Sequence, residues 1–371
     1  METQVKPAAA PLVEPLPAAE WPLERQCEWI ADCWRSQWGA IQMGLLRELG
    51  GQELAEFKER ILRRHQRGHF LEGLTKLGIS RDLPPAVIAG RYHYLSNMLG
   101  GLSMEYIEES PKRVWVRYHA PSWSFTGLSL IAVPSIVQRA MFAGWHPHNG
   151  VSLGCPQLGF VVTKVFQDGE PYDEGYFEEF DQPLLPEDRV QYRPVTRSPD
   201  FDPDRAPKLD PKVWPKDRLS RAFRSFSRGY MDDAIKTCLE RYGVHATARY
   251  VGHSLRLFAV QFFAEYKQKL GVTGTKARDL VQFFAYLAEM AGEEFAVERD
   301  ASGALRVTRS NRLLVGEDVP VEIYDALFQF PKTCAKVLSA RVRIVMESLT
   351  VDRDKGARET WLIEDTKDRL Y

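Results

Sequence analysis

The chain has 371 residues, of which 44% are hydrophobic and 27% are charged. This composition is typical of a globular protein with a sizeable core, and it excludes a largely disordered or fibrous chain. Lys and Arg together number 49 and Asp and Glu together number 50, which leaves a formal net charge of -1. Because there is no excess of basic charge, we expect neither nucleic acid nor an anionic membrane as a partner.

The N-terminal residues and the cysteines indicate a cytoplasmic location. Residues 1–20 contain Pro and Glu where a secretory signal peptide needs a basic start and an unbroken apolar run, so a disordered tail is expected. No stretch approaches the roughly eighteen uncharged apolar residues of a transmembrane helix. The five cysteines are odd in number, scattered and without a CxxC pair, which argues against a disulfide framework or a zinc knuckle.

Three helices are predicted in the first part of the chain. Over residues 30–49, apolar side chains recur at steps of three and four, which indicates an amphipathic helix. A second helix is expected from about 53 to 77, ending at Gly78, a residue type that commonly ends helices. A third is expected over 85–100, after two consecutive prolines.

Two hairpins and a short helix follow. Apolar and polar residues alternate over 104–118 around Ser110-Pro111-Lys112, which predicts a β-hairpin. A short helix is expected over 134–142, and a second hairpin over 158–180 that turns at Asp168-Gly169. Helices combined with hairpins in this order predict an α+β fold with an antiparallel sheet.

The next segment, residues 181–218, contains eight of the 23 prolines. Proline removes a backbone donor and disfavours helix at the residue before it. We therefore predict a semi-extended linker that joins neither neighbouring core as a regular element.

The second half of the chain repeats the pattern of the first half. The segment LGG…GHFLEGLTKLGI (49–79) aligns with YGV…QFFAEYKQKLGV (242–272), and RYHYLSNMLGG (91–101) aligns with FFAYLAEMAGE (283–293). Further along, VPSIVQRAMF matches VPVEIYDALF. Matches in the same order predict a duplication. We expect two tandem α+β modules, residues 21–180 and 219–371, packed as an internal pseudo-dimer.

This order of elements resembles a known family. Helices come first, followed by a glycine with alternating apolar residues and a Glu-Glu pair, a hairpin, a short helix and a hairpin closed at Asp-Gly. The pattern is similar to the L-2-amino-thiazoline-4-carboxylic acid hydrolase-like proteins, and more loosely to the 4-vinyl reductase ligand-binding domain. The resemblance implies the fold and a small-molecule ligand. The cysteines that these modules often carry are replaced here by Ala120-Pro121-Ser122-Trp123 and Tyr176-Phe177, so their chemistry is not implied.

Positions at which the two copies differ point to a polar cavity in the first module. In the alignment, polar residues of the first copy meet apolar residues of the second in four pairs: His65 with Phe258, His69 with Phe262, Arg91 with Phe283 and His93 with Ala285. Two histidines four residues apart on a helix project to the same side. Because burying unpaired polar groups is costly, several such replacements favour a functional cavity.

A second cluster lies in the same copy, at Trp145-His146-Pro147-His148-Asn149-Gly150 and Cys155. Together the two clusters give the candidate site. The candidate catalytic residues are His65, His69, His93, His146 and His148. The candidate substrate-binding residues are Arg91, Tyr92, Trp145, Asn149 and Cys155.

The sequence leaves several alternatives for the chemistry of the site. A histidine could act as general acid–base with Arg91 holding a carboxylate or enolate, or His65 and His69 could bind a single divalent metal with His146 or His148. Cys155 as a nucleophile would need an adjacent base. Glycine-rich phosphate loops are absent from the sequence, which disfavours nucleotide chemistry.

We therefore expect an enzyme that acts on a carboxylated or aromatic or heterocyclic small molecule, by hydrolysis or an acid–base lyase step. The alternatives are a non-catalytic ligand-binding protein and an auxiliary subunit that needs a partner protein. A site open to solvent would favour catalysis, a closed aromatic pocket would favour ligand binding, and a broad exposed apolar patch would favour a subunit.

Overall fold

The computed structural model describes residues 20–122 and 125–371. Nearly all of the predicted N-terminal tail, residues 1–19, lies outside the described residues. The protein is α+β, with two sheets built mainly of antiparallel strands, as predicted. The chain divides into two compact units. The large unit comprises residues 31–241, and the small unit comprises residues 242–371 together with the residues up to Ile30.

The first three helices lie close to where the sequence predicts them. They are α1 (Leu23–Leu49), α2 (Gly51–Leu77) and α3 (Pro85–Leu99). Gly50 separates α1 from α2 with φ 86°, a backbone conformation that favours glycine. Gly78 ends α2 in the left-handed conformation, as its sequence position predicts.

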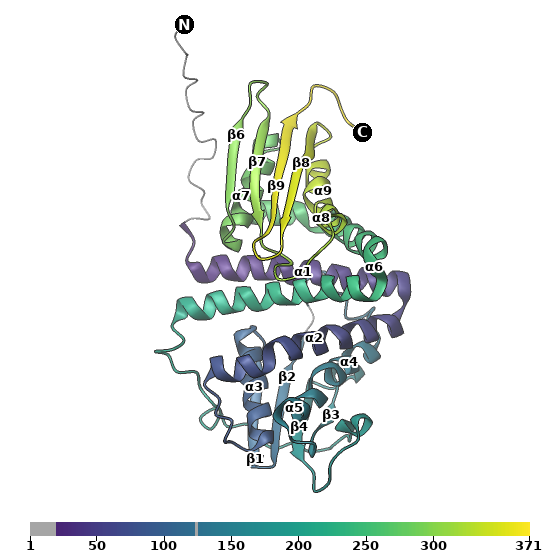
Figure 1. Ribbon diagram of the computed structural model, residues 1–371, viewed down its shortest axis with the longest axis vertical. Helices are drawn as coiled ribbons and strands as arrows, with labels where there is room; N and C mark the ends of the chain where they lie inside the picture. The colour runs from purple at the N-terminus through teal and green to yellow at the C-terminus, as the bar shows by residue number, and fades with distance from the viewer. Residues whose placement is uncertain (1–19, 123–124) are drawn as a thin grey trace. The chain divides into compact units, whose positions relative to one another are not determined.

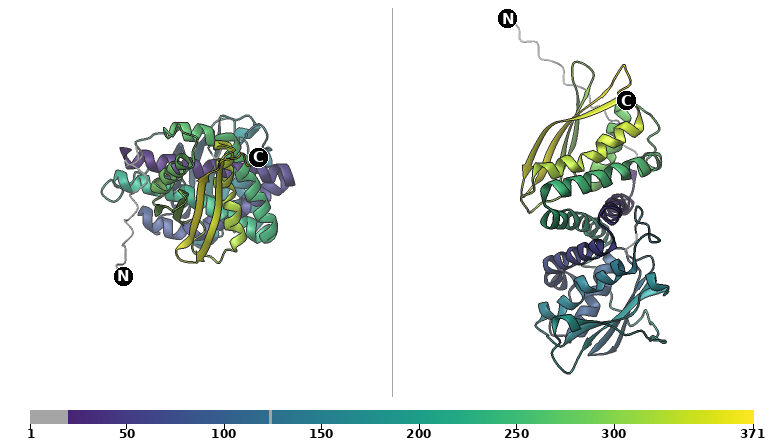
Figure 2. Two further views of the ribbon diagram at one scale, coloured as in Figure 1. Left: turned by 90° about the horizontal axis from the view of Figure 1, so that it is seen from above. Right: turned by 90° about the vertical axis from the view of Figure 1, so that its right-hand side faces the viewer.

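The large unit contains a five-stranded sheet in the order β1-β2-β4-β3-β5. The two predicted hairpins supply β1 (Met104–Ser110) with β2 (Arg113–His119), and β3 (Leu158–Lys164) with β4 (Tyr172–Glu179). Between them lie α4 (Ser135–Trp145) and α5 (Pro147–Leu153). Helix α3 contacts β1, β2 and β4, and α5 contacts β3 (Figure 1). The helices thus lie on one face of the sheet (Figure 2, right).

The proline-rich segment adds a strand to this sheet and packs against its other face. Its residues Val190–Tyr192 form β5, which pairs parallel with β3, after a short 3-10 helix, η3 (Pro186–Arg189). Val195 and Phe180 pack on a buried cluster of Trp115, Val161 and Tyr176. The prediction that this segment joins neither core as a regular element is wrong. Because β5 contains no proline and is an edge strand, the flanking prolines remove no hydrogen bond from the sheet.

The small unit repeats the same order of elements. The long α6 (Lys216–Lys269) spans both units, and α7 (Ala277–Ala291) follows. The strands are β6 (Phe295–Arg299), β7 (Leu305–Asn311), β8 (Val342–Asp352) and β9 (Gly356–Asp365), with α8 (Val321–Leu327) and α9 (Gln329–Leu338) between the two hairpins. Their order in the sheet, β6-β7-β9-β8, corresponds to β1-β2-β4-β3. A duplication predicts this correspondence.

Local details agree with the repeat. Gly243 interrupts α6 with φ 75° and ψ 176°, close to the φ 86° and ψ 174° of Gly50 between α1 and α2. In each copy the second helix also carries an exposed Lys-to-Glu ion pair, Lys76 to Glu72 and Lys269 to Glu265.

The boundary between the units differs from the one proposed from sequence. Residues 181–241 belong to the large unit, so the compact division falls after Arg241 and not at residue 219. The first part of α6, up to Arg241, therefore contributes side chains to the unit that contains the first module. This placement decides the composition of the candidate site.

Candidate functional site

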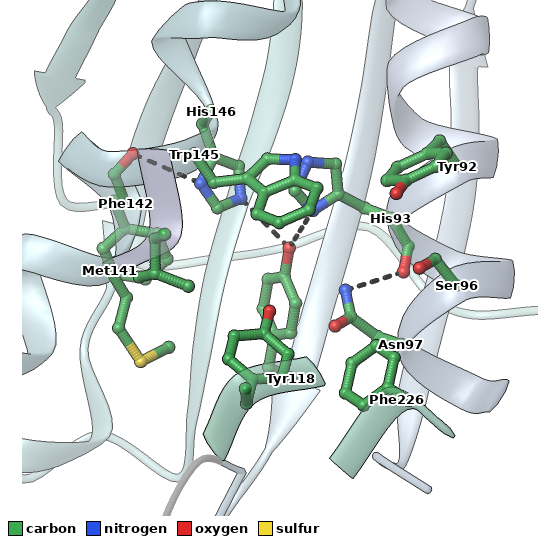
Figure 3. Close-up of a pocket in the computed structure, with 12 residues that line it drawn as sticks. Tyr92, His93, Ser96, Asn97, Tyr118, Met141, Phe142, Trp145, His146 and Phe226 are labelled. Atoms are coloured by element: carbon green, nitrogen blue, oxygen red, sulfur yellow. Dashed lines mark hydrogen bonds between the residues drawn. The ribbon is translucent and has the colours of Figure 1, made fainter. Parts of the chain in front are cut away.

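A small pocket lies within the large unit and contains four of the predicted site residues, Tyr92, His93, Trp145 and His146 (Figure 3). Its volume is about 30 Å³, which is room for about two water molecules. The remaining lining residues are mostly apolar or aromatic, and two of them come from α6: Leu62, Ser96, Asn97, Tyr118, Met141, Phe142, Phe226 and Tyr230.

Tyr118 is the centre of a buried hydrogen-bond chain. Its hydroxyl lies 2.9 Å from His93 Nδ1 and 3.0 Å from His146 Nε2 (Figure 3). His146 Nδ1 lies 3.3 Å from the Phe142 carbonyl, so this nitrogen carries the proton and Nε2 accepts from Tyr118. Asn149 Nδ2 donates to His93 Nε2 over 3.0 Å, so His93 donates from Nδ1 to the tyrosine oxygen. The hydrogen bonds thus all point the same way, from the Asn149 amide through His93, Tyr118 and His146 to the Phe142 carbonyl.

Burial keeps the three central groups of this chain neutral. It lowers the pKa of His93 well below the usual value and lowers the pKa of His146 to about 3. It also raises the pKa of the Tyr118 hydroxyl well above 10, with the negative charge of Asp173 as a second cause. Efficient general acid–base groups have pKa values near the working pH. These three side chains are therefore a hydrogen-bonded scaffold, with no proton to exchange near pH 7.

Two buried polar atoms next to this scaffold have no hydrogen-bond partner among the described residues. They are Nε1 of Trp145 and Oδ1 of Asn149. Both side chains are well buried, with Trp145 at 7% and Asn149 at 0% exposure. Leaving such groups unpaired costs about 1–3 kcal/mol each. Trp145 also lines the pocket.

His65 and His69 lie beside the pocket, in a cluster with Asp233 of α6. His65 is buried, and its Nδ1 lies 2.7 Å from Asp233 Oδ2. Its ring stacks on Tyr230, with centroids 4.2 Å apart. His69 is exposed, and its ring centroid is 4.2 Å from that of His65. His65, His69 and Asp233 each offer one donor atom, and these three atoms all lie within 4.8 Å of one another. This group could hold a metal ion.

Arg91 does not reach the pocket. Its aligned residue in the second copy, Phe283, is fully buried, but the arginine side chain remains 35% exposed and lies 3.5 Å from Glu108 of β1. The expectation that Arg91 binds a substrate carboxylate in the cavity is therefore corrected. A long charged side chain can leave a buried helix position and place its head group at the surface, whereas phenylalanine cannot.

His148 and Cys155 also lie outside the residues that line the pocket. Desolvation lowers the pKa of His148 to about 4, with the positive charges of Arg63, Arg67 and Arg189 as further causes. Burial raises the pKa of the Cys155 thiol, and the charge of Glu179 adds to this effect. A raised pKa disfavours the thiolate, so Cys155 is a poor nucleophile.

Two buried titratable groups, Asp173 beside Tyr118 in the sheet and Lys58 of α2, interact electrostatically. Asp173 of β4 is paired in register with Tyr118 and is fully buried. Its carboxylate accepts hydrogen bonds from the Phe166 backbone N–H and the Gln138 side chain. Lys58 of α2 is 3% exposed. Burial lowers the pKa of Lys58 to about 8, an effect that the negative charge of Asp173 opposes.

Sequence reasoning missed Tyr118, Asp233 and Asp173. Tyr118 is one of several alternating strand residues, and its position between two histidines depends on the packing of α3 and α4 on the sheet. Asp233 lies on α6, far along the chain from His65, so no local pattern connects them. For Asp173, the only indication in the sequence is an acidic residue within the second predicted hairpin, residues 158–180.

No protein-family model, curated protein or solved structure matches this chain. The resemblance to the L-2-amino-thiazoline-4-carboxylic acid hydrolase-like family therefore stays a prediction from sequence. Within residues 20–122 and 125–371, no helix has the combination of length and apolar character that crossing a bilayer requires.

Proposed function

We propose that the large unit binds a small neutral aromatic or heterocyclic molecule in the pocket around Tyr118. The observation that carries this proposal is the Trp145 Nε1–H group, a buried donor without a partner among the described residues, on a side chain that lines a mainly apolar pocket. Small-molecule sites are typically apolar cavities with a few polar groups that orient the ligand. A ligand with a hydrogen-bond acceptor would satisfy this donor.

The lining residues favour a neutral ligand. None of the described residues that line the pocket is Lys or Arg, and Arg91 lies at the surface. A carboxylate would be buried there without a cation, which is energetically costly. The part of the sequence-based expectation that names a carboxylated compound is therefore less well supported than the part that names an aromatic or heterocyclic one.

The size of the pocket also limits the ligand. At about 30 Å³ it accommodates a single ring only if a lining side chain moves. Met141 is the lining residue best suited to such a movement, because its unbranched side chain has three rotatable bonds. The proposed ligand is accordingly one ring with an acceptor atom.

Hydrolysis or a lyase step is less well supported than binding. The pKa of His146 is about 3 and that of His93 is well below its usual value, whereas acid–base catalysis at neutral pH needs values near 7. An auxiliary role with a partner subunit and the packing of the two modules as an internal pseudo-dimer also remain proposals from sequence.

The test compares pyridine with benzene, which differ by one ring acceptor. We expect the wild-type protein to bind pyridine about tenfold more tightly in an NMR titration, since one hydrogen bond contributes about 1–1.5 kcal/mol. The Trp145→Phe variant should lose this preference because it lacks the N–H donor. The control is Trp115→Phe, because Trp115 lies on the other face of the sheet and donates to Glu109.

The control variant should keep the wild-type preference for pyridine. A wild-type protein that binds neither ring, or a Trp145→Phe protein with an unchanged preference, would overturn the proposal.

A further inference from the structure

We propose that His65, His69 and Asp233 form a binding site for a divalent transition-metal ion such as zinc. The geometry points to this because two imidazoles and one carboxylate present their donor atoms to one another within 4.8 Å. Zinc is commonly bound by these donor types. The inference does not depend on a ligand in the neighbouring pocket.

The spacing of the donors suits one ion. In a tetrahedral zinc site, bonds of about 2.0–2.2 Å hold the ligand atoms about 3.3 Å apart. His65 Nδ1 and Asp233 Oδ2 are separated by 2.7 Å, and no pair in the cluster exceeds 4.8 Å. Small side-chain adjustments therefore bring all three donors to metal-binding distances. An ion would replace the hydrogen bond that joins His65 and Asp233.

Two of the three donors are already fixed by their neighbours. The His65 ring is stacked on Tyr230 and lies 5.5 Å from the Trp145 ring. Asp233 binds Arg64 Nε through Oδ1, at 3.3 Å, while Oδ2 faces His65. Groups of this kind orient metal ligands and raise affinity. The cluster thus has positioning residues as well as donors.

The third donor, His69, contacts the His65 ring, with centroids 4.2 Å apart. Because His69 is exposed, an ion could enter from solvent. Three protein ligands would leave a fourth position open, as in catalytic zinc sites.

The second copy provides an internal comparison. The residues aligned with His65 and His69 are Phe258 and Phe262, whose ring centroids are 5.0 Å apart. The same helical positions there carry no metal donor. His69→Phe is therefore a substitution that this repeat accommodates, and it should remove a ligand without unfolding the protein.

The test measures cobalt(II) binding to the full-length chain without an affinity tag, after treatment with a chelator. We expect one ion per chain with visible d–d absorption and no thiolate-to-cobalt charge-transfer band, and we expect zinc to displace it. His69→Phe and Asp233→Asn should each weaken binding by about 100-fold or more, since even residues that only orient ligands contribute 10–100-fold. Circular dichroism shows whether each variant is folded.

The control is His148→Phe, which removes a half-buried histidine outside the cluster and should leave cobalt affinity unchanged. If Asp233→Asn does not fold, the His69→Phe result decides. The proposal is overturned if the wild-type chain binds no cobalt, if folded His69→Phe binds as tightly as wild type, or if His148→Phe weakens binding equally.

Discussion

Replacing Tyr118 with phenylalanine should lower the free energy of unfolding by about 2–4 kcal/mol. The substitution keeps the ring but removes the hydroxyl that accepts from His93 Nδ1 and donates to His146 Nε2. Both nitrogens would then be buried without a partner, and each unsatisfied group costs about 1–3 kcal/mol. Neither histidine takes up a second proton near pH 7 to offset this loss, because burial lowers the pKa of both. Urea denaturation measures the loss.

The matched control is Tyr94→Phe. Tyr94 lies on α3 and is also buried, at 7% exposure, but it is outside the Tyr118 chain. Removing its hydroxyl should change the free energy of unfolding by less than about 0.5 kcal/mol. If Tyr118→Phe were as stable as Tyr94→Phe, the hydrogen-bond chain could not be a scaffold of the pocket. A loss confined to Tyr118→Phe would support that role.

The sequence predicts the local features of this fold well because they depend on neighbouring residues. Periodic apolar side chains locate the first three helices, Gly78 ends α2, and alternating residues locate β1 and β2. Gly50 and Gly243 adopt similar backbone angles at aligned positions. Each of these features depends on a short stretch of sequence.

Features that depend on distant contacts are less predictable. The proline count of residues 181–218 indicates an irregular segment, yet an edge strand forms there because the open edge of β3 provides a pairing partner. Arg91 occupies an apolar helix position but reaches the surface. The position of His93 next to His146 agrees with a polar cavity in the first copy, whereas the roles of Tyr118 and Asp233 require knowledge of the packing.

A second large effect is expected in the pH dependence of stability. Burial raises the pKa of Asp173 to about 7, although hydrogen bonds from the Phe166 backbone and Gln138 oppose the shift. In the unfolded chain this carboxyl should titrate near its ordinary value of 3.8. Between about pH 4 and pH 7, the folded protein holds a proton at Asp173 that the unfolded chain has released, so the contribution of this carboxyl to stability falls as pH rises. The histidines with lowered pKa values, His69, His93, His146 and His148, contribute with the opposite sign. The loss assigned to Asp173 is about 4 kcal/mol across this window.

The Asp173→Asn variant isolates this contribution. Asparagine keeps the shape and can accept from the Phe166 N–H, but it has no proton to release, so the free energy of unfolding of the variant should rise relative to that of wild type by about 4 kcal/mol between pH 4 and pH 7. The comparison uses urea denaturation at several pH values, because other groups titrate equally in both proteins. Asp168→Asn, which removes a carboxylate from the turn before β4, serves as the control and should keep the wild-type pH profile. Parallel pH profiles for wild type and Asp173→Asn would contradict a buried carboxyl that stays protonated up to about pH 7.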